Sequence, residues 1–143
     1  MRDAGYDIQY AVAAALSGIT YNGAPVGVFD QQAPIGAEFP RILLGSISGG
    51  GPRQSKCHFG GTWTQQIKVT AYFRKDVTKN IIYNISDQIM AILVPHKGPY
   101  IYIGDNFTVY RVDGNLQGDV RYSNGTGTFI DRNISITYYI TEK

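Results

Sequence analysis

Two stretches of alternating apolar and polar side chains constrain the fold of this chain more than any other feature of its sequence. The clearer one lies near the C-terminus, where every second residue from Ile130 to Ile140 is apolar except Arg132. The other runs from Trp63 to Phe73. A period of two places the apolar residues on one face, so each stretch predicts a half-buried strand with one polar face. Such strands are typical of an antiparallel sheet that is covered on one side.

Two other segments have the helical period. The first begins at a cap near Asp7 and runs to about Leu16, where Ser-Gly ends it. The second begins at Asp76 or Thr78 and ends before Pro95. Isoleucine is a weak helix former, so packing on the sheet must stabilise the second helix. Its predicted apolar stripe is Ile81, Ile82, Ile85, Ile89, Ile92 and Leu93.

Shorter strands complete the prediction. Residues 19–21 and 26–29 flank an Asn-Gly turn and predict a small hairpin. Residues 41–48 predict a strand led by a proline, and residues 100–103 and 107–112 predict two more. Without a linker or a repeat, the 143 residues predict one domain. We expect an α+β fold, with two helices on one face of a mainly antiparallel sheet.

A glycine-rich arm interrupts this pattern between two predicted strands. It spans Gly49 to Gly61 and has little apolar content and no periodicity. A connection of this length in a compact domain is typically a binding loop or a segment ordered by a partner. Arg53, Lys56 and His58 make the arm modestly basic beside Phe59. The arm could touch nucleic acid phosphates, but so few cations favour a solvated loop or a protein-contact arm instead.

Composition narrows the classes of function. The net charge of +2 is too small to indicate nucleic acid or an anionic membrane by itself. The eleven tyrosines favour a protein-contact surface, although strands also recruit tyrosine. A single cysteine allows no disulfide within the chain, and neither a leader-like nor a membrane-spanning run is present. We therefore expect a soluble protein made in a reducing cytoplasm.

The chain has no convincing set of catalytic residues. Cys57, His58 and His96 fall short of the four ligands of a structural zinc site, and nothing holds Cys57 and His96 together as nucleophile and base. The glycine run lacks the Gly-Lys pair of a phosphate loop. The aspartates lie at expected turns and caps, where they serve the backbone. We expect no enzyme activity, no metal and no cofactor.

Arg132 stands in the apolar register of the last strand. A charge at that position either extends to water at the sheet edge or pairs with a carboxylate. Asp113 and Asp119 are the candidate partners. A structural role is expected for Arg132 rather than a functional one.

The segment Phe39-Pro40-Arg41-Ile42-Leu43-Leu44-Gly45 resembles a signature of phage tail-terminator (tail-completion) and head–tail joining proteins. The resemblance extends through the order of elements: an opening helix, a short strand at 26–29, the signature, a long loop, a strand and an amphipathic helix at 79–94. Members of this family form closed rings, often hexamers, at an end of the tail tube. They have no catalytic residues. The long final hairpin, residues 100–143, and the glycine-rich arm depart from the family pattern.

The resemblance implies a structural virion protein, made in the bacterial cytoplasm, that forms a ring at the head–tail interface or the tail end. A hexamer is expected and a dodecamer is the alternative. Its partners would be copies of itself and the adjoining connector and tail proteins, with DNA passing through the lumen without sequence-specific binding. A small peptide- or protein-binding module is the alternative function. The residues predicted at the contacts are Arg53, Lys56, His58, Phe59, Trp63, Tyr72 and Tyr139.

Overall fold

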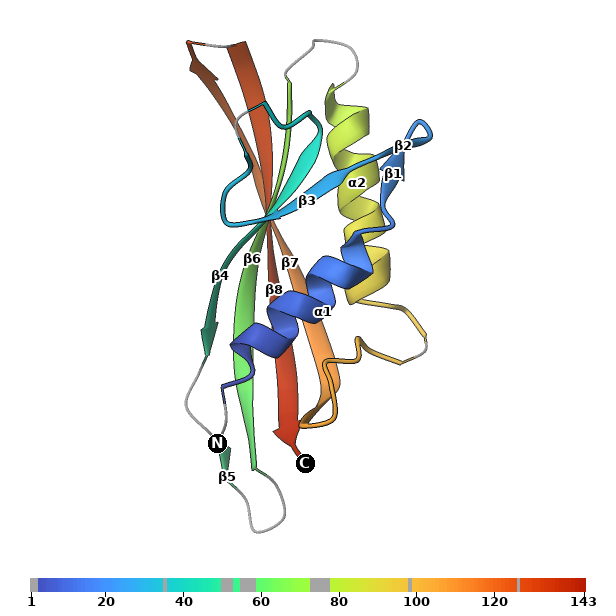
Figure 1. Cartoon of the computed structure of the whole chain (residues 1–143), viewed down its shortest axis with the longest axis vertical. Helices are drawn as coiled ribbons and strands as arrows, with labels where there is room; N and C mark the ends of the chain where they lie inside the picture. Colours follow the sequence, from blue (N-terminus) through green and yellow to red (C-terminus); the bar gives the residue numbers. More distant parts are fainter. Residues whose placement is uncertain are drawn as a thin grey trace.

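The computed structural model describes residues 3–34, 36–49, 53–54, 59–72, 78–97, 99–125 and 127–143 (Figure 1). Two helices and a large mixed sheet form the fold. In chain order the elements are α1 (Gly5–Leu16), β1 (Thr20–Tyr21), β2 (Ala24–Pro25), β3 (Gly27–Asp30), β4 (Arg41–Gly49), β5 (Arg53–Gln54), β6 (Phe59–Tyr72), α2 (Thr78–Leu93), β7 (Phe107–Asn124) and β8 (Gly127–Glu142).

The large sheet has the strand order β3-β4-β6-β8-β7, and β5 also pairs with β6. Only β3 and β4 run parallel among the strands described, and the other pairs are antiparallel. The predicted α+β class with a mainly antiparallel sheet is therefore confirmed. The longest ladders join β6 to β8 and β8 to β7, which makes the sheet long and narrow (Figure 1).

The predicted hairpin at 19–29 is only partly correct. β1 and β2 pair around Asn22 and Gly23, whose positive φ angles of 51° and 79° suit the tight turn that the Asn-Gly pair predicts. The chain then turns away, and β3 forms a parallel ladder with β4. The Asn-Gly pair was sufficient to predict the turn. The partner of β3 is β4, which is distant in sequence, so turn chemistry could not predict that pairing.

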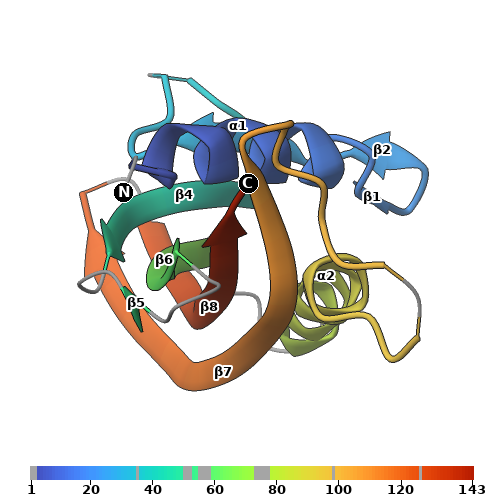
Figure 2. The same ribbon diagram turned by 90° about the horizontal axis from the view of Figure 1, so that it is seen from below.

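Both helices cover the same face of the sheet, as predicted. α1 contacts β3 and β4, whereas α2 contacts β6 and β8. Figure 2 shows α1 lying alongside β4. The register aligns the apolar residues of neighbouring strands, for example Leu44 with Ile67 and Ile67 with Ile134. The buried side chains on this face include Ile42, Leu44, Ile67, Val69, Ile134, Ile136 and Tyr138, with Ile8, Val12 and Leu16 of α1 and Ile82, Ile85, Ile89 and Leu93 of α2. The prediction that Ile92 belongs to the buried stripe of α2 is wrong, because its side chain is 38% exposed.

The strands extend beyond the predicted bounds. β6 begins at Phe59 and β5 pairs with it, so residues 53–54 and 59–61 of the predicted arm belong to the sheet. β7 continues through the Gly/Asn-rich stretch to Asn124, whereas residues 100–103 form no strand. The full length of β7 could not be predicted, because bulges break the alternation of side chains along a strand. The β7–β8 register has two such irregularities, between Val109 and Arg111 and between Leu116 and Asp119.

Arg132 pairs with Asp119, one of its two predicted partners. Its Nη1 lies 2.9 Å from Asp119 Oδ1, and its Nε donates to Ser86 Oγ on α2 at 3.2 Å. The guanidinium also lies over the ring of Tyr83, 4.7 Å from the ring centre. The other candidate, Asp113, pairs with Arg111 instead, at 3.0 Å. Arg132 therefore links β8 to both β7 and α2.

Candidate protein-contact site

The sheet face turned away from the helices has a polar middle. Lys68 Nζ lies 3.8 Å from Asp131 Oδ2, and Thr70 donates to Asp131 Oδ1 at 2.8 Å. Thr64 and Thr137 lie 3.3 Å apart at their hydroxyl oxygens. Thr64 is paired with Thr137 and Thr70 with Asp131, while Lys68 is diagonal to Asp131, so the alternation of side chains places them all on one face. Thr70 and Asp131 are themselves buried there. We call this surface the open face.

An aromatic cluster lies at one end of the open face. Its members are Phe39, Tyr72, Tyr122 and Phe129, and the name aromatic cluster refers below to these four residues. The register sets it, because Phe129 of β8 is opposite both Tyr72 of β6 and Tyr122 of β7. The Phe129 ring centre lies 5.0 Å from that of Tyr72 and 5.5 Å from that of Tyr122. Phe39 completes the cluster at 4.6 Å from Tyr72 and 5.0 Å from Phe129.

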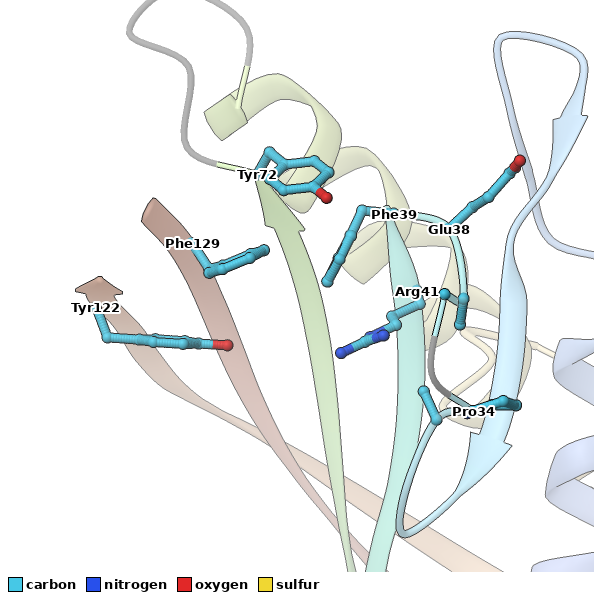
Figure 3. Close-up of a pocket in the computed structure, with 10 residues that line it drawn as sticks. Pro34, Glu38, Phe39, Arg41, Tyr72, Tyr122 and Phe129 are labelled. Atoms are coloured by element: carbon cyan, nitrogen blue, oxygen red, sulfur yellow. The ribbon is translucent and has the colours of Figure 1, made fainter. Parts of the chain in front are cut away.

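The aromatic cluster borders a hollow of about 590 Å³ between the strands and the loop before β4 (Figure 3). Pro34, Gly36 and Glu38 line its loop side. Arg41 extends from the first position of β4 into the hollow (Figure 3). Its guanidinium lies over the Phe39 ring, 4.1 Å from the ring centre. This arrangement combines a cation with aromatic walls, which suits recognition of another molecule better than it suits acid–base chemistry.

Tyr122 keeps its proton in this setting. Burial raises the pKa of its hydroxyl above the ordinary value of 10, and the nearby Asp131 carboxylate raises that pKa further. Arg41 acts in the opposite direction, but more weakly than burial. Tyr122 is therefore a neutral hydroxyl at physiological pH, able to donate a hydrogen bond.

A second aromatic site lies near the other end of β8. The ring centres of Tyr110 and Tyr139 are 6.3 Å apart, and Arg111 lies over the Tyr139 ring at 4.9 Å from its centre. Tyr110 is 51% exposed. The open face thus carries aromatic side chains near both ends of its long strands, with polar rows between them.

β7 is an edge strand of unusual length, at 18 residues. Within the described part of the chain, no strand pairs with its outer edge. Leu116 and Val120 are 44% and 54% exposed. An exposed edge of this kind can accept a strand from another chain, although the two bulges disturb its regularity.

The structure separates the residues predicted at the contacts. Tyr72 belongs to the aromatic cluster and Tyr139 to the second aromatic site, whereas Trp63 is 6% exposed and packs in the core. Trp63 lies against Gly49, where a Cβ atom would come within 2.6 Å of its Nε1. The remaining predicted residues fall elsewhere: the backbones of Arg53 and Phe59 lie in β5 and β6, while Lys56, His58 and the predicted zinc or nucleophile candidate Cys57 lie outside the described residues.

Sequence reasoning missed Phe39, Arg41, Tyr122 and Phe129 as site residues. Phe39 and Arg41 stand in the signature segment, which identified a strand but gave no reason to expect a hollow beside it. Tyr122 and Phe129 belong to strands whose register was not predictable. The high tyrosine content was the one sequence signal of an aromatic contact surface, and it could have suggested Tyr122 alone of the four.

Two other features of the described residues bear on function. No group of three or more His, Cys, Asp or Glu side chains that could hold a metal ion occurs among them. Neither described helix is sufficiently long and apolar to span a membrane.

Comparisons with known proteins find a likeness of fold. No known family and no curated protein matches the sequence. A solved chain described as "Virion of native gene transfer agent (GTA) particle" is similar in structure, with a TM-score of 0.57. The two sequences are 10% identical, and the likeness covers 98% of this chain and 92% of that chain. At this identity the likeness shows a shared fold over nearly the whole length of both chains.

Proposed function

We propose that this protein is a structural virion protein of a phage-like particle, and that it forms a ring at the head–tail interface or the tail end. The observation that carries the proposal is the fold likeness to a virion chain over 98% of this chain. The signature at 39–45 and the order of elements support the same class. Such a protein acts by protein–protein contact, without catalysis or a cofactor.

A closed ring of identical subunits needs two different, complementary surfaces on each copy. Two aromatic sites near opposite ends of the open face and the free edge of β7 offer such surfaces. Tyr72 and Tyr139 stay in the proposed contacts, together with the arm residues Arg53, Lys56, His58 and Phe59. Trp63 supports the base of the arm from the core. A hexamer is the proposed stoichiometry, with adjoining connector and tail proteins as further partners and DNA passing through the lumen.

The experiment is a mass measurement by sedimentation velocity and native mass spectrometry over a wide range of concentration. A ring gives a discrete mass several times the 15.8 kDa of one chain. Negative-stain images should then show closed rings. Tyr139→Ser should weaken the assembly, whereas Tyr83→Ser, on α2, should not. A discrete monomer at every concentration, alone and with tail-tube protein, would contradict the proposal.

A second candidate function rests on the free edge of β7. A small binding module could take an extended peptide there by strand addition, since main-chain hydrogen bonds supply the affinity. Such a module would stay monomeric at 15.8 kDa and would show amide protection along β7 when the peptide is added. The same mass measurement separates the two functions.

A further inference from the structure

We propose that the hollow beside the aromatic cluster is a binding site for a carboxylate carried by a different polypeptide, next to an apolar or aromatic side chain of that polypeptide. Arg41 would bind the carboxylate, and the rings of Phe39 and Tyr122 would pack against the neighbouring side chain. This inference rests on the proposed function, because it names a site through which the protein would hold an adjoining virion protein.

Arg41 lacks the partner that its chemistry requires. Its Nε is buried and has no hydrogen-bond acceptor, and among the described residues its guanidinium makes no ion pair. The guanidinium lies against the face of the Phe39 ring, and it also acts electrostatically on the Tyr122 hydroxyl. A guanidinium in this position presents a rigid set of donors that matches the two oxygens of a carboxylate. Because Arg41 lines the hollow and pairs with none of the described carboxylates, its guanidinium can meet an incoming carboxylate from that side.

The carboxylates near Arg41 do not fill this role. Asp131 is on the adjacent part of the sheet, but its two oxygens already face Thr70 and Lys68. Glu38 lines the hollow, yet its side chain points away from the guanidinium (Figure 3). The positive charge in the hollow is thus left for an outside group.

Most described carboxylates elsewhere in the chain are also engaged, which favours a different polypeptide over a second copy. Each of the following accepts a hydrogen bond within its own chain: Asp3, Asp30, Asp105, Asp113 and Asp119. A carboxylate recruited from a second copy would in most cases have to give up such a bond.

The walls of the hollow define the rest of the ligand. Four aromatic side chains and a proline line the hollow beside the guanidinium, so a side chain flanking the carboxylate would be buried against apolar surface. The volume of about 590 Å³ lies within the range of small-ligand sites and would hold a short segment of a chain. A nucleic acid backbone fits less well, because its repeated phosphates would meet one cation, Arg41, among the described residues that line the hollow.

The test uses ligand-detected saturation-transfer NMR on the whole protein, which works at any assembly size. The probes are N-acetylphenylalanine, which has a free carboxylate, and N-acetylphenylalaninamide, which is its neutral match. The acid should bind saturably and about tenfold more tightly than the amide, the difference expected for one charge-assisted pair. Arg41→Gln should abolish this difference. Arg111→Gln, at the second aromatic site, should leave it intact.

Each other outcome overturns the inference. Equal binding of acid and amide would show a purely aromatic site. Tighter binding of inorganic phosphate or of a dinucleotide would show a phosphate site. Absence of probe binding to the wild type, together with loss of assembly in Arg41→Gln only, would show that a second copy fills the hollow. The masses of the wild type and both variants distinguish failure of the carboxylate site from failure of the ring. If the wild type and both variants form rings but bind no probe, only the carboxylate site is refuted. If the protein is a monomer that binds the acid, only the ring is refuted.

Discussion

Tyr138 donates a hydrogen bond of 2.8 Å to Oε1 of Gln65, and both side chains are fully buried between the sheet and α1. Gln65 in turn donates to Gln9 of α1 at 2.8 Å, and Gln9 donates to Asp30 at the end of β3 at 2.7 Å. This relay joins β8, β6, α1 and β3, and it runs from the buried Tyr138 and Gln65 through Gln9 to the exposed Asp30. Since buried polar groups are costly without partners, the relay fixes how α1 sits on the sheet.

Removal of the Tyr138 hydroxyl should therefore destabilise the fold. We expect Tyr138→Phe to lower the free energy of unfolding by about 1–2 kcal/mol, because the buried Gln65 oxygen loses its donor. Urea denaturation followed by circular dichroism measures this change. Tyr110→Phe is the matched control, since Tyr110 is half exposed, and it should change stability by less than about 0.5 kcal/mol. A Tyr138→Phe protein as stable as the control would show that the relay contributes nothing.

Stability should also fall at alkaline pH. Burial raises the pKa of Tyr138 far above its ordinary value of 10, so the folded protein keeps a proton that the unfolded chain releases above about pH 10. The stability that the protonated Tyr138 contributes is present in full below the pKa that this residue has in the unfolded chain. It is lost as the pH rises above that pKa. Tyr138 alone should lower the free energy of unfolding by about 1.4 kcal/mol per pH unit there. Urea midpoints measured between about pH 9 and about pH 11 should fall more steeply for the wild type than for Tyr138→Phe; parallel curves would refute the assignment.

The Arg132–Asp119 pair should stabilise the fold more than an exposed pair of similar geometry. Its side chains are 15% and 22% exposed, against 60% and 46% for Arg111 and Asp113. A double-mutant cycle of Arg132→Gln and Asp119→Asn should give a coupling of about 1 kcal/mol or more. The cycle on the exposed pair should give less than about 0.5 kcal/mol, because water screens it. Equal couplings would mean that burial does not strengthen the inner pair.

Much of the fold could be predicted from local patterns. The alternation in β6 and β8 identified two half-buried strands, and the helical stripes gave both helices and the face that they cover. Asn22-Gly23 gave the tight turn. These features depend on residues close in sequence, so periodicity and turn chemistry are sufficient to find them. The parallel ladder of β3 and the full length of β7 depend instead on distant pairings and on bulges, which leave no regular pattern.

The candidate site was harder to predict for the same reason. The aromatic cluster exists because Tyr72, Phe129 and Tyr122 are aligned across three strands and Phe39 reaches them from a loop. No local pattern in the sequence connects these four positions. Tyr72 was predicted at a contact only because it faces the polar side of its strand. The unpaired state of Arg41 is likewise a property of its neighbours in space, so only the structure could draw attention to it.

Gly60 should tolerate substitution poorly, because it lies where β6 and β8 approach closely. A Cβ atom there would stand 2.7 Å from the carbonyl oxygen of Ile140, which is backbone and cannot move without opening the ladder. Gly60→Ala should cost about 1–3 kcal/mol. At Gly114 the nearest atom is Cε of Met90 at 2.5 Å, the end of a flexible side chain, so Gly114→Ala should cost less than about 1 kcal/mol. Gly18→Ala, with no atom within 4 Å, is the control for alanine itself. Unfolding free energies from urea titrations should rank Gly60→Ala as the most destabilised variant; if Gly114→Ala were worse, side chains rather than backbone contacts would limit the approach of neighbouring elements.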